Sequence, residues 1–302
     1  MISFDTVLYV QGQLILLALF GYWFRRKAVG AEFQKGLSTV LVDLVLPCNI
    51  LTSYQMELTG ELLARSKSVL VIAVAYEVLS IFLAAVLFRK TSPDKRPVKQ
   101  FGTINSNAGY VGLTVADGLW GPEGVFLTSI YLIPMRIVMW SVGVAYFTSD
   151  RNGGFLKKVL TNHCIDATLL GILMMIFHWR LPGVLGDAVG AMGRCTTGLS
   201  MFLIGMIISQ IRWRDFLDGD VLKITFFRLA VLPALVLILC RLLHTDALST
   251  GVSVILTAMP AGTSCALLAS RYDKGAAYAA GFVTVSTLLS LVTIPLWGLI
   301  LG

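Results

Sequence analysis

NSNAGYVG, residues 105–112, and MPAGTS, residues 259–264, are polar, glycine-containing stretches that interrupt long apolar runs, one in each half of the 302-residue chain. Both weaken a helix, because Gly costs about 1 kcal/mol relative to Ala in a helix interior and Pro260 has no backbone N–H to donate. In hydrocarbon an unsatisfied backbone group is expensive, so broken backbone is tolerated only inside protein or beside a water-filled cavity. We therefore expect two broken helices at matching positions in the two halves.

The sequence around these breaks has the composition of an integral membrane protein. Hydrophobic residues make up 56% of the chain and charged residues 14%, with a mean hydropathy of +0.80. A soluble domain normally carries about 25% charged residues, and a membrane-crossing helix needs about 20 apolar ones. The apolar runs predict an all-α fold of ten transmembrane helices. The predicted spans are residues 6–24, 35–54, 66–88, 99–119, 122–147, 164–178, 187–210, 219–243, 246–270 and 274–300.

The distribution of basic residues predicts how these spans are oriented. The odd-numbered loops, together with the span ends beside them, hold 17 Lys and Arg, whereas the even-numbered loops with their span ends hold 4. Because cytoplasmic loops are enriched in Lys and Arg, the odd loops are predicted to be cytoplasmic and both termini to lie outside. We expect a multi-pass protein of the cell membrane, plasma or inner, whose partner is the lipid bilayer. The same asymmetry accounts for the net charge of +7 without a nucleic-acid partner.

An odd number of spans in each half predicts an inverted repeat. Five spans precede the loop 148–163 and five follow it, so the second half would lie in the membrane upside down relative to the first. The predicted repeats are residues 1–150 and 151–302. Inverted repeats are common in secondary transporters, whose binding sites lie where discontinuous helices meet at the membrane midplane.

The breaks also predict what kind of ligand would bind there. The half-helix after each break begins near the midplane, and a helix N-terminus carries about half a positive charge, so two N-termini together favour an anion. The half-helices before the breaks end in carbonyl groups that would suit a cation. The alternative is a pair of simple kinks packed by small residues. The candidate substrate-binding residues are Asn105, Ser106, Asn107, Gly109, Pro260, Gly262, Thr263 and Ser264.

Three ionisable residues fall near the centres of predicted spans: Asp43, Glu77 and Arg136. Each charge would cost at least about 2.5–3.5 kcal/mol at the centre of an isolated helix, so each should face protein or water. Either Arg136 pairs with Glu77 or Asp43 as a structural ion pair, or it attracts an anionic substrate while a carboxylate takes up a proton or another ion. Arg194 and Arg228 lie closer to span ends, and we expect both to snorkel.

Other classes of protein find little support. The five cysteines are odd in number and form no CxxC pair, and the three histidines lack metal-ligand spacing, so no metal site or cofactor is expected. The chain has no Walker A loop, GxSxG elbow or HExxH motif, which argues against an enzyme. A transporter is therefore predicted. The alternative is a membrane sensor or receptor that binds a small anion in the same pocket, although the sequence holds no soluble output domain.

Three stretches resemble the auxin efflux carrier family, which includes the plant PIN auxin exporters and bacterial malate and malonate carriers. They are LVLPCNILTSY at residues 44–54, NSNAGYVGLTVADGLWG at 105–121 and AMPAGTSCALLASRYD at 258–273. Their order and the span count extend the resemblance over essentially the whole chain. The sequence departs from plant members at Ser106 and Thr114, where those members commonly have Pro, and in the short loop 148–163.

The resemblance implies a fold related to the bile-acid/sodium symporters, in which two broken helices cross. By position, spans one, two, six and seven would form a scaffold, and spans three to five and eight to ten a mobile transport domain. It also implies a homodimer, elevator-like alternating access and small organic anion substrates such as carboxylates. Proton or sodium coupling is left open.

Overall fold

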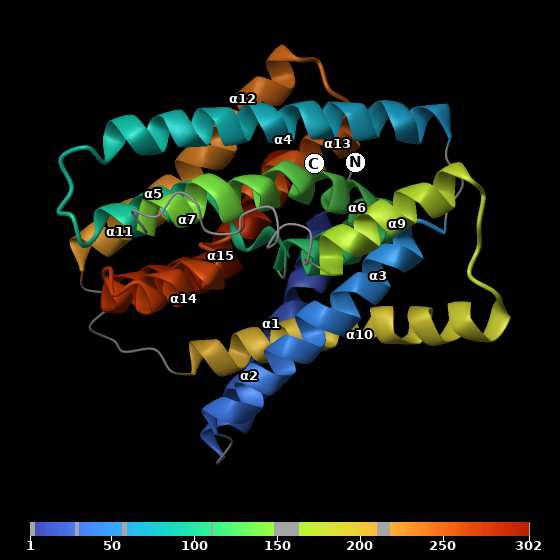
Figure 1. Ribbon diagram of the computed structural model, residues 1–302, viewed down its shortest axis with the longest axis horizontal. Coiled ribbons are helices and arrows are strands. Elements are labelled where there is room, and N and C mark those ends of the chain that lie inside the picture. Colours follow the sequence, from blue (N-terminus) through green and yellow to red (C-terminus); the bar gives the residue numbers. More distant parts are fainter. Residues whose placement is uncertain are drawn as a thin grey trace.

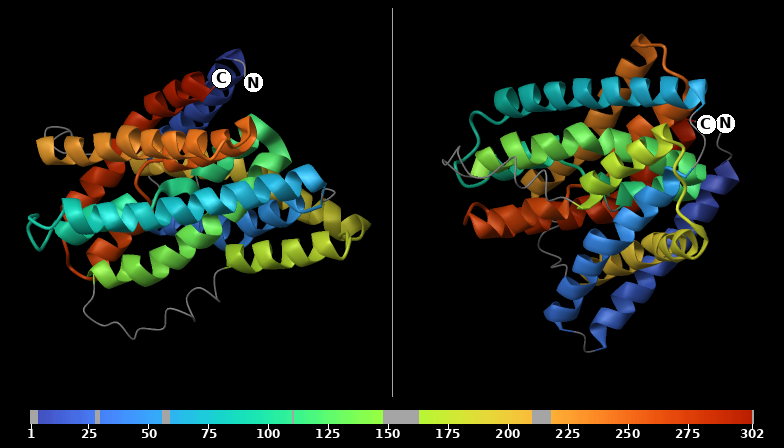
Figure 2. Two further views of the ribbon diagram at one scale, coloured as in Figure 1. Left: turned by 90° about the horizontal axis from the view of Figure 1, so that it is seen from above. Right: turned by 45° about the vertical axis from the view of Figure 1, so that its right-hand side comes forward.

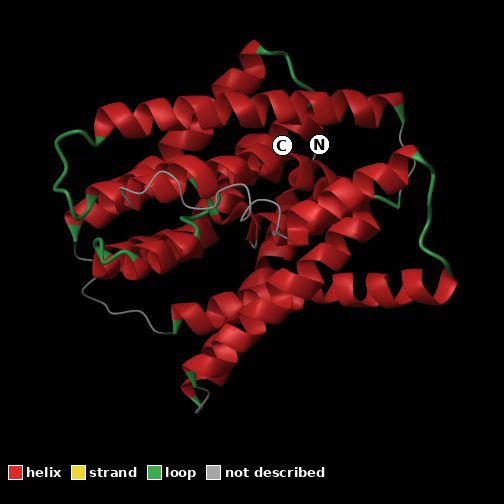
Figure 3. Cartoon of the chain, in the orientation of Figure 1, coloured by secondary structure: helices red, strands yellow, loops and turns green. Residues whose placement is uncertain are grey.

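The described part of the chain is helical throughout. The computed structural model describes residues 4–27, 30–55, 59–109, 111–147, 163–209 and 218–301. Within those ranges there is no strand, and a single antiparallel β-bridge joins Ser106 to Ala261 (Figure 3). The predicted all-α class is confirmed.

The helices follow the apolar runs of the sequence. The first half contains α1 (Phe4–Arg26), α2 (Ala31–Val40), η1 (Leu41–Val45), α3 (Leu46–Ser53), α4 (Gly60–Leu87), α5 (Arg96–Ile104), η2 (Asn107–Gly109), α6 (Val111–Val138), η3 (Met139–Gly143) and α7 (Val144–Phe147). The second half contains α9 (His163–Ile176), α10 (Gly183–Ile208), α11 (Gly219–Phe226), η5 (Phe227–Val231), α12 (Leu232–Leu242), α13 (Ala247–Thr257), α14 (Thr263–Arg271) and α15 (Ala276–Leu301).

Side-chain caps and backbone kinks fix where several helices begin. The side chains of Thr59, Asp218 and Asp246 accept hydrogen bonds from the first backbone N–H groups of α4, α11 and α13, which otherwise have no intrahelical partner. Inside α6, Gly121 has a φ of +59° and is followed by Pro122, which kinks the helix there. The kink falls between the fourth and fifth predicted spans.

Some of these helices are long and apolar enough to cross a membrane. Among the described residues, four meet that test by length and composition: Glu32–Ser53, Gly60–Leu87, Gly219–Leu242 and Ala276–Leu301. The bent pair Val111–Val138 and Ser141–Phe147 would make a fifth. The described residues therefore include several helices that are long and apolar enough to cross a membrane, and the full count of ten stays a prediction.

The helices gather into two groups. In Figure 1, and again on the right of Figure 2, the blue and gold helices α1, α2, α3 and α10 lie below a layer that contains α4, α5 and α7. Helices α1 and α10 pack closely, because a Cβ added at Gly21 or Gly205 would run into backbone of the opposite helix, at Phe202 and Ala18 respectively. Close helix contact through small residues is typical of membrane helices.

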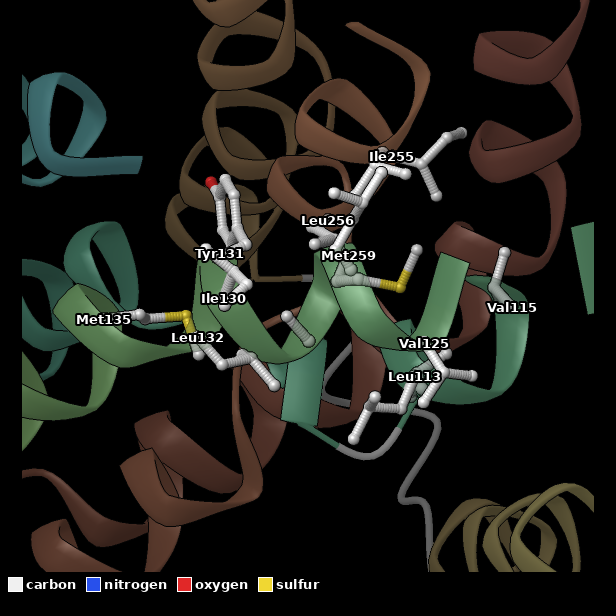
Figure 4. Close-up of a cluster of buried hydrophobic side chains, with 14 of the residues drawn as sticks. Leu113, Val115, Val125, Ile130, Tyr131, Leu132, Met135, Ile255, Leu256 and Met259 are labelled. Carbon is white, nitrogen blue, oxygen red and sulfur yellow. The ribbon is translucent and has the colours of Figure 1, made fainter. Parts of the chain in front are cut away.

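The largest buried apolar cluster runs from the first group into the second. Leu113, Tyr131 and Met135 of α6 belong to the same buried cluster as Leu256, near the end of α13, and Met259, just beyond it (Figure 4). These five side chains are at most 4% exposed. The core therefore lies around the ends of the broken helices.

Two clusters of charged residues tie helix ends together. Arg65, near the start of α4, pairs with Glu61, with Glu123 beside the α6 kink and with Asp246 at the start of α13. Beyond the other end of α4, Lys95 and Lys99 pair with aspartates at the start of α11. Helix α4 has 28 residues and therefore spans about 42 Å. The two clusters lie at opposite ends of it.

Candidate functional site

The two breaks meet and pair through their backbones. Ser106 and Ala261 form the β-bridge, the N–H of Asn107 donates to the Pro260 carbonyl at 2.7 Å, and the N–H of Gly262 donates to the Asn105 carbonyl at 3.4 Å. Backbone groups that leave a helix must find partners in a membrane protein. Each break supplies partners to the other, so the kinked-helix alternative does not describe these stretches.

Neighbouring helices hold this crossing in place. The N–H of Ala261 donates to Ser286 Oγ of α15 at 3.1 Å, and Ser106 Oγ donates to the Leu256 carbonyl of α13 at 3.1 Å. The Ser106 hydroxyl is therefore used in holding the crossing together. Pro260 contributes its carbonyl oxygen, as described above.

The half-helices that leave the crossing are α6, which begins at Val111, and α14, which begins at Thr263. Asn105 joins the two breaks, because its Nδ2 donates to Ser264 Oγ at 2.8 Å. The other end of the amide, Asn105 Oδ1, is buried and has no hydrogen-bond partner among the described residues. Asn105 and Ser264 are thus brought together as candidate ligand groups.

Gly262 keeps space free at this point. A Cβ built at Gly262 would lie 2.5 Å from Asn105 Nδ2 and 3.2 Å from Ser264 Oγ. The first distance is well inside van der Waals contact, so any other residue would displace the Asn105 amide. Asn107 is buried, Gly109 is half-buried, and the side chain of Thr263 lies outside the described residues.

A buried cation lies beside the first break. Arg136 of α6 is 7% exposed, and its Nη2 is 3.8 Å from the position that a Cβ would take on Gly109. Its guanidinium also interacts with Cys164 of α9. Among the described residues no ion pair joins Arg136 to Glu77 or to Asp43, so the predicted structural ion pair is not observed. The structure brings Arg136 to the crossing instead.

The two carboxylates predicted at mid-depth have different surroundings. Glu77 of α4 is 2% exposed, and neither of its carboxylate oxygens accepts a hydrogen bond from the described residues. The nearby Ser80 hydroxyl donates to the Glu77 backbone carbonyl instead, at 2.9 Å. Asp43 lies on η1 and is exposed. The three charged residues therefore do not form one cluster.

Arg228 was expected to snorkel, and that expectation is wrong. Its side chain is 0% exposed and donates hydrogen bonds to backbone carbonyls at the ends of α5 and α13, just before the two breaks, and to the Met259 carbonyl at the start of the second break. Arg194, by contrast, is exposed on α10, and its snorkelling stays a prediction. A signal that could have identified Arg228 is Pro233, five residues later, because a proline in an apolar span disturbs the helix that precedes it.

Comparisons with known proteins match nearly the whole chain. The family described as Membrane transport protein matches residues 11–158 and 152–298. An uncharacterized transporter of Methanothermobacter thermautotrophicus is 26% identical over 99% of this chain and 98% of its own length. One from Methanocaldococcus jannaschii is 23% identical over 100% of this chain and 99% of its own, and the uncharacterized transporter YfdV of Escherichia coli K12 is 20% identical over 94% of each.

Proposed function

The chain belongs to the membrane transport protein family, that of the auxin efflux carriers, and from this premise we propose that it is a secondary carrier of small organic anions such as carboxylates. One observation carries the proposal: the starts of α6 and α14 lie at a crossing of two broken segments, with a buried arginine beside it.

The electrostatics of the crossing favour a negative ligand. Each helix N-terminus contributes about half a positive charge through its unpaired N–H groups. The Arg136 guanidinium adds a full positive charge, and no carboxylate among the described residues forms an ion pair with it. In apolar surroundings this charge is weakly screened. A carboxylate suits such a site, because a guanidinium can donate two parallel hydrogen bonds to it.

Asn105 and Ser264 supply neutral hydrogen-bonding groups next to that charge. One end of the Asn105 amide is bonded to Ser264, and the other accepts no hydrogen bond from the part of the chain that the structure describes. An amide offers an oxygen acceptor at one end and two N–H donors at the other, whereas a hydroxyl can donate or accept. Ser264 can therefore accept from the Asn105 N–H or donate to the Asn105 oxygen. In the first case Asn105 presents its oxygen to a substrate hydroxyl, and in the second its N–H groups to a carboxylate.

We propose that transport moves one group of helices against the other. The scaffold would contain α1, α2, η1, α3, α9 and α10, and the transport domain α4–α7 and α11–α15, arranged as inverted repeats over residues 1–150 and 151–302. In support, the proposed transport domain contains both breaks, both charged clusters and Arg136. Elevator-like movement and a homodimer rest on the family resemblance, and the outside location of both termini rests on the Lys and Arg asymmetry.

For coupling, Glu77 is the stronger candidate of the two carboxylates. It is buried within the proposed transport domain and its oxygens have no hydrogen-bond partner among the described residues, whereas Asp43 is exposed. A carboxyl group in that position can bind a proton on one side of the membrane and release it on the other.

The proposal is tested by measuring binding and flux on the same protein. Purified protein is first screened by thermal shift against mono- and dicarboxylates, and the best ligand is then used, radiolabelled, in proteoliposomes preloaded with the unlabelled anion. A carrier accumulates label by exchange, and protein-free liposomes do not. Binding without exchange would identify a sensor, and the absence of both would refute the proposal.

A further inference from the structure

The half-helices that precede the two breaks, α5 and α13, also end close together, and their last carbonyl oxygens point to a common place. Helix α5 ends at Ile104 and α13 ends at Thr257. The last carbonyls of a helix have no intrahelical partner and carry about half a negative charge. In transporters, such half-helix C-termini and unwound carbonyls are the groups that hold a coupling cation.

In this protein the side chain of Arg228 lies at that point. Its Nη1 donates to the Thr103 carbonyl at 2.9 Å, its Nη2 to the Thr257 carbonyl at 2.8 Å, and its Nε to the Met259 carbonyl at 3.2 Å. Nη1 also donates to the Tyr76 hydroxyl at 2.7 Å, which itself donates to the Thr103 carbonyl at 2.9 Å. Four of the five N–H groups of the guanidinium are therefore used.

The helix that carries Arg228 is shaped to bring it inward. Residues Phe227–Val231 form a wide π-helical turn, which is followed by Pro233. Pro233 cannot donate to the Leu229 carbonyl four residues earlier, and that carbonyl accepts a hydrogen bond from Trp297 Nε1 of α15 at 2.8 Å instead. Single π-helical turns inside α-helices are frequent at functional sites.

The charges at this point nearly balance without a carboxylate. Two helix C-termini together supply about one negative charge, which is enough to offset one guanidinium. Arg228 forms no ion pair among the described residues, and Glu77 lies near enough only to interact electrostatically. The two helix C-termini thus balance the charge of Arg228, and the carboxylate of Glu77 is not needed to neutralise the guanidinium.

We propose that Arg228 is a built-in cation of this carrier, fixed where the C-termini of α5 and α13 would otherwise hold an alkali cation such as sodium. Arg228 is a positioning residue, because it acts by holding the carbonyl ends of both breaks and so the geometry of the anion site. The consequence for transport rests on the proposed function: sodium does not couple at this point. Removal of the side chain should leave a site that accepts a small soluble cation.

The test is chemical rescue of R228A, with R194A as the matched control because Arg194 is exposed on α10. Melting temperatures are measured in detergent with methylguanidinium, sodium or choline chloride at equal ionic strength. R228A should melt roughly 5–15 °C below wild type, and methylguanidinium should restore part of that loss. Methylguanidinium should leave R194A and wild type unchanged relative to choline. An R228A protein that is as stable as wild type, or not rescued, would overturn the proposal.

Two further measurements do not require folded R228A. Wild-type protein should melt at the same temperature in sodium and in choline. R228K, which keeps the charge but not the planar fork, should melt between wild type and R228A or aggregate less than R228A. A higher melting temperature of wild type in sodium than in choline would contradict the proposal that Arg228 occupies the cation site. Neither measurement involves a substrate, so the failure of every carboxylate to be transported would refute the proposed function while leaving this inference intact.

Discussion

The substitution Gly262→Ala probes the crossing with one added methyl group. The new Cβ would lie 2.5 Å from Asn105 Nδ2, 3.2 Å from Ser264 Oγ and 3.4 Å from the Ser106 carbonyl oxygen. Some group must move, and the backbone around it is held by the Ser106–Ala261 bridge and by the hydrogen bond from Asn107 to Pro260. The Asn105 amide is the movable group, so its hydrogen bond to Ser264 should break.

The size of the effect follows from what that amide does. For stability, the loss of one neutral hydrogen bond costs about 0.5–1.5 kcal/mol. For binding, hydrogen bonds to a charged ligand contribute about 1.5–3 kcal/mol each, which corresponds to about 10- to 150-fold in Kd. The free energy of anion binding lost in Gly262→Ala should therefore exceed the free energy of unfolding lost in the same variant.

Isothermal titration calorimetry with the best carboxylate from the thermal-shift screen measures this difference. The matched control is Gly198→Ala, because a Cβ at Gly198 of α10 meets nothing within 4 Å. That variant should bind like wild type. If folded, monodisperse Gly262→Ala also binds with wild-type affinity, the space beside Asn105 is not part of the anion site.

Three further outcomes are expected. Arg136→Gln should raise the Kd for a carboxylate at least about tenfold, with Arg136→Lys affected less, because the charge beside Gly109 is lost in the first and kept in the second; calorimetry that shows no change would remove Arg136 from the site. Glu77→Gln keeps the shape of the side chain but cannot release a proton, so exchange in proteoliposomes should survive while accumulation driven by a pH gradient is lost; undiminished accumulation would show that Glu77 does not couple. Single cysteines at positions 60 and 94 should react with an impermeant maleimide from opposite sides of the membrane, outside and cytoplasmic respectively, and labelling from the same side would contradict the ten-span topology.

Composition and local pattern were enough to predict the class of protein and the place of its breaks. Charge depletion around long apolar runs identified a membrane protein, and Pro260 and Gly262 marked where a helix could not continue. That the two breaks meet came from the family resemblance, since pairing between residues 106 and 261 depends on tertiary packing that no local pattern reports. Asn105 and Ser264 were selected as polar groups in the breaks, but their mutual hydrogen bond was not foreseen.

The charged residues were the least predictable part. Position along a span indicates depth in the membrane, but which side of the helix a residue faces depends on helical phase. A π-helical segment changes that phase, and both Asp43 and Arg228 lie in such segments, Leu41–Val45 and Phe227–Val231. Asp43 is exposed and Arg228 fully buried, in contrast to what their depth alone indicated.

We propose above that the crossing of the two breaks binds the transported anion. The most direct measurement is a crystal structure with a brominated carboxylate, chosen because it competes with the best ligand of the screen, and located by the anomalous scattering of bromine. We expect an anomalous peak at the crossing, beside Asn105, Ser264 and Arg136. A peak found only elsewhere, for example between α1 and α10, with none at the crossing would contradict it.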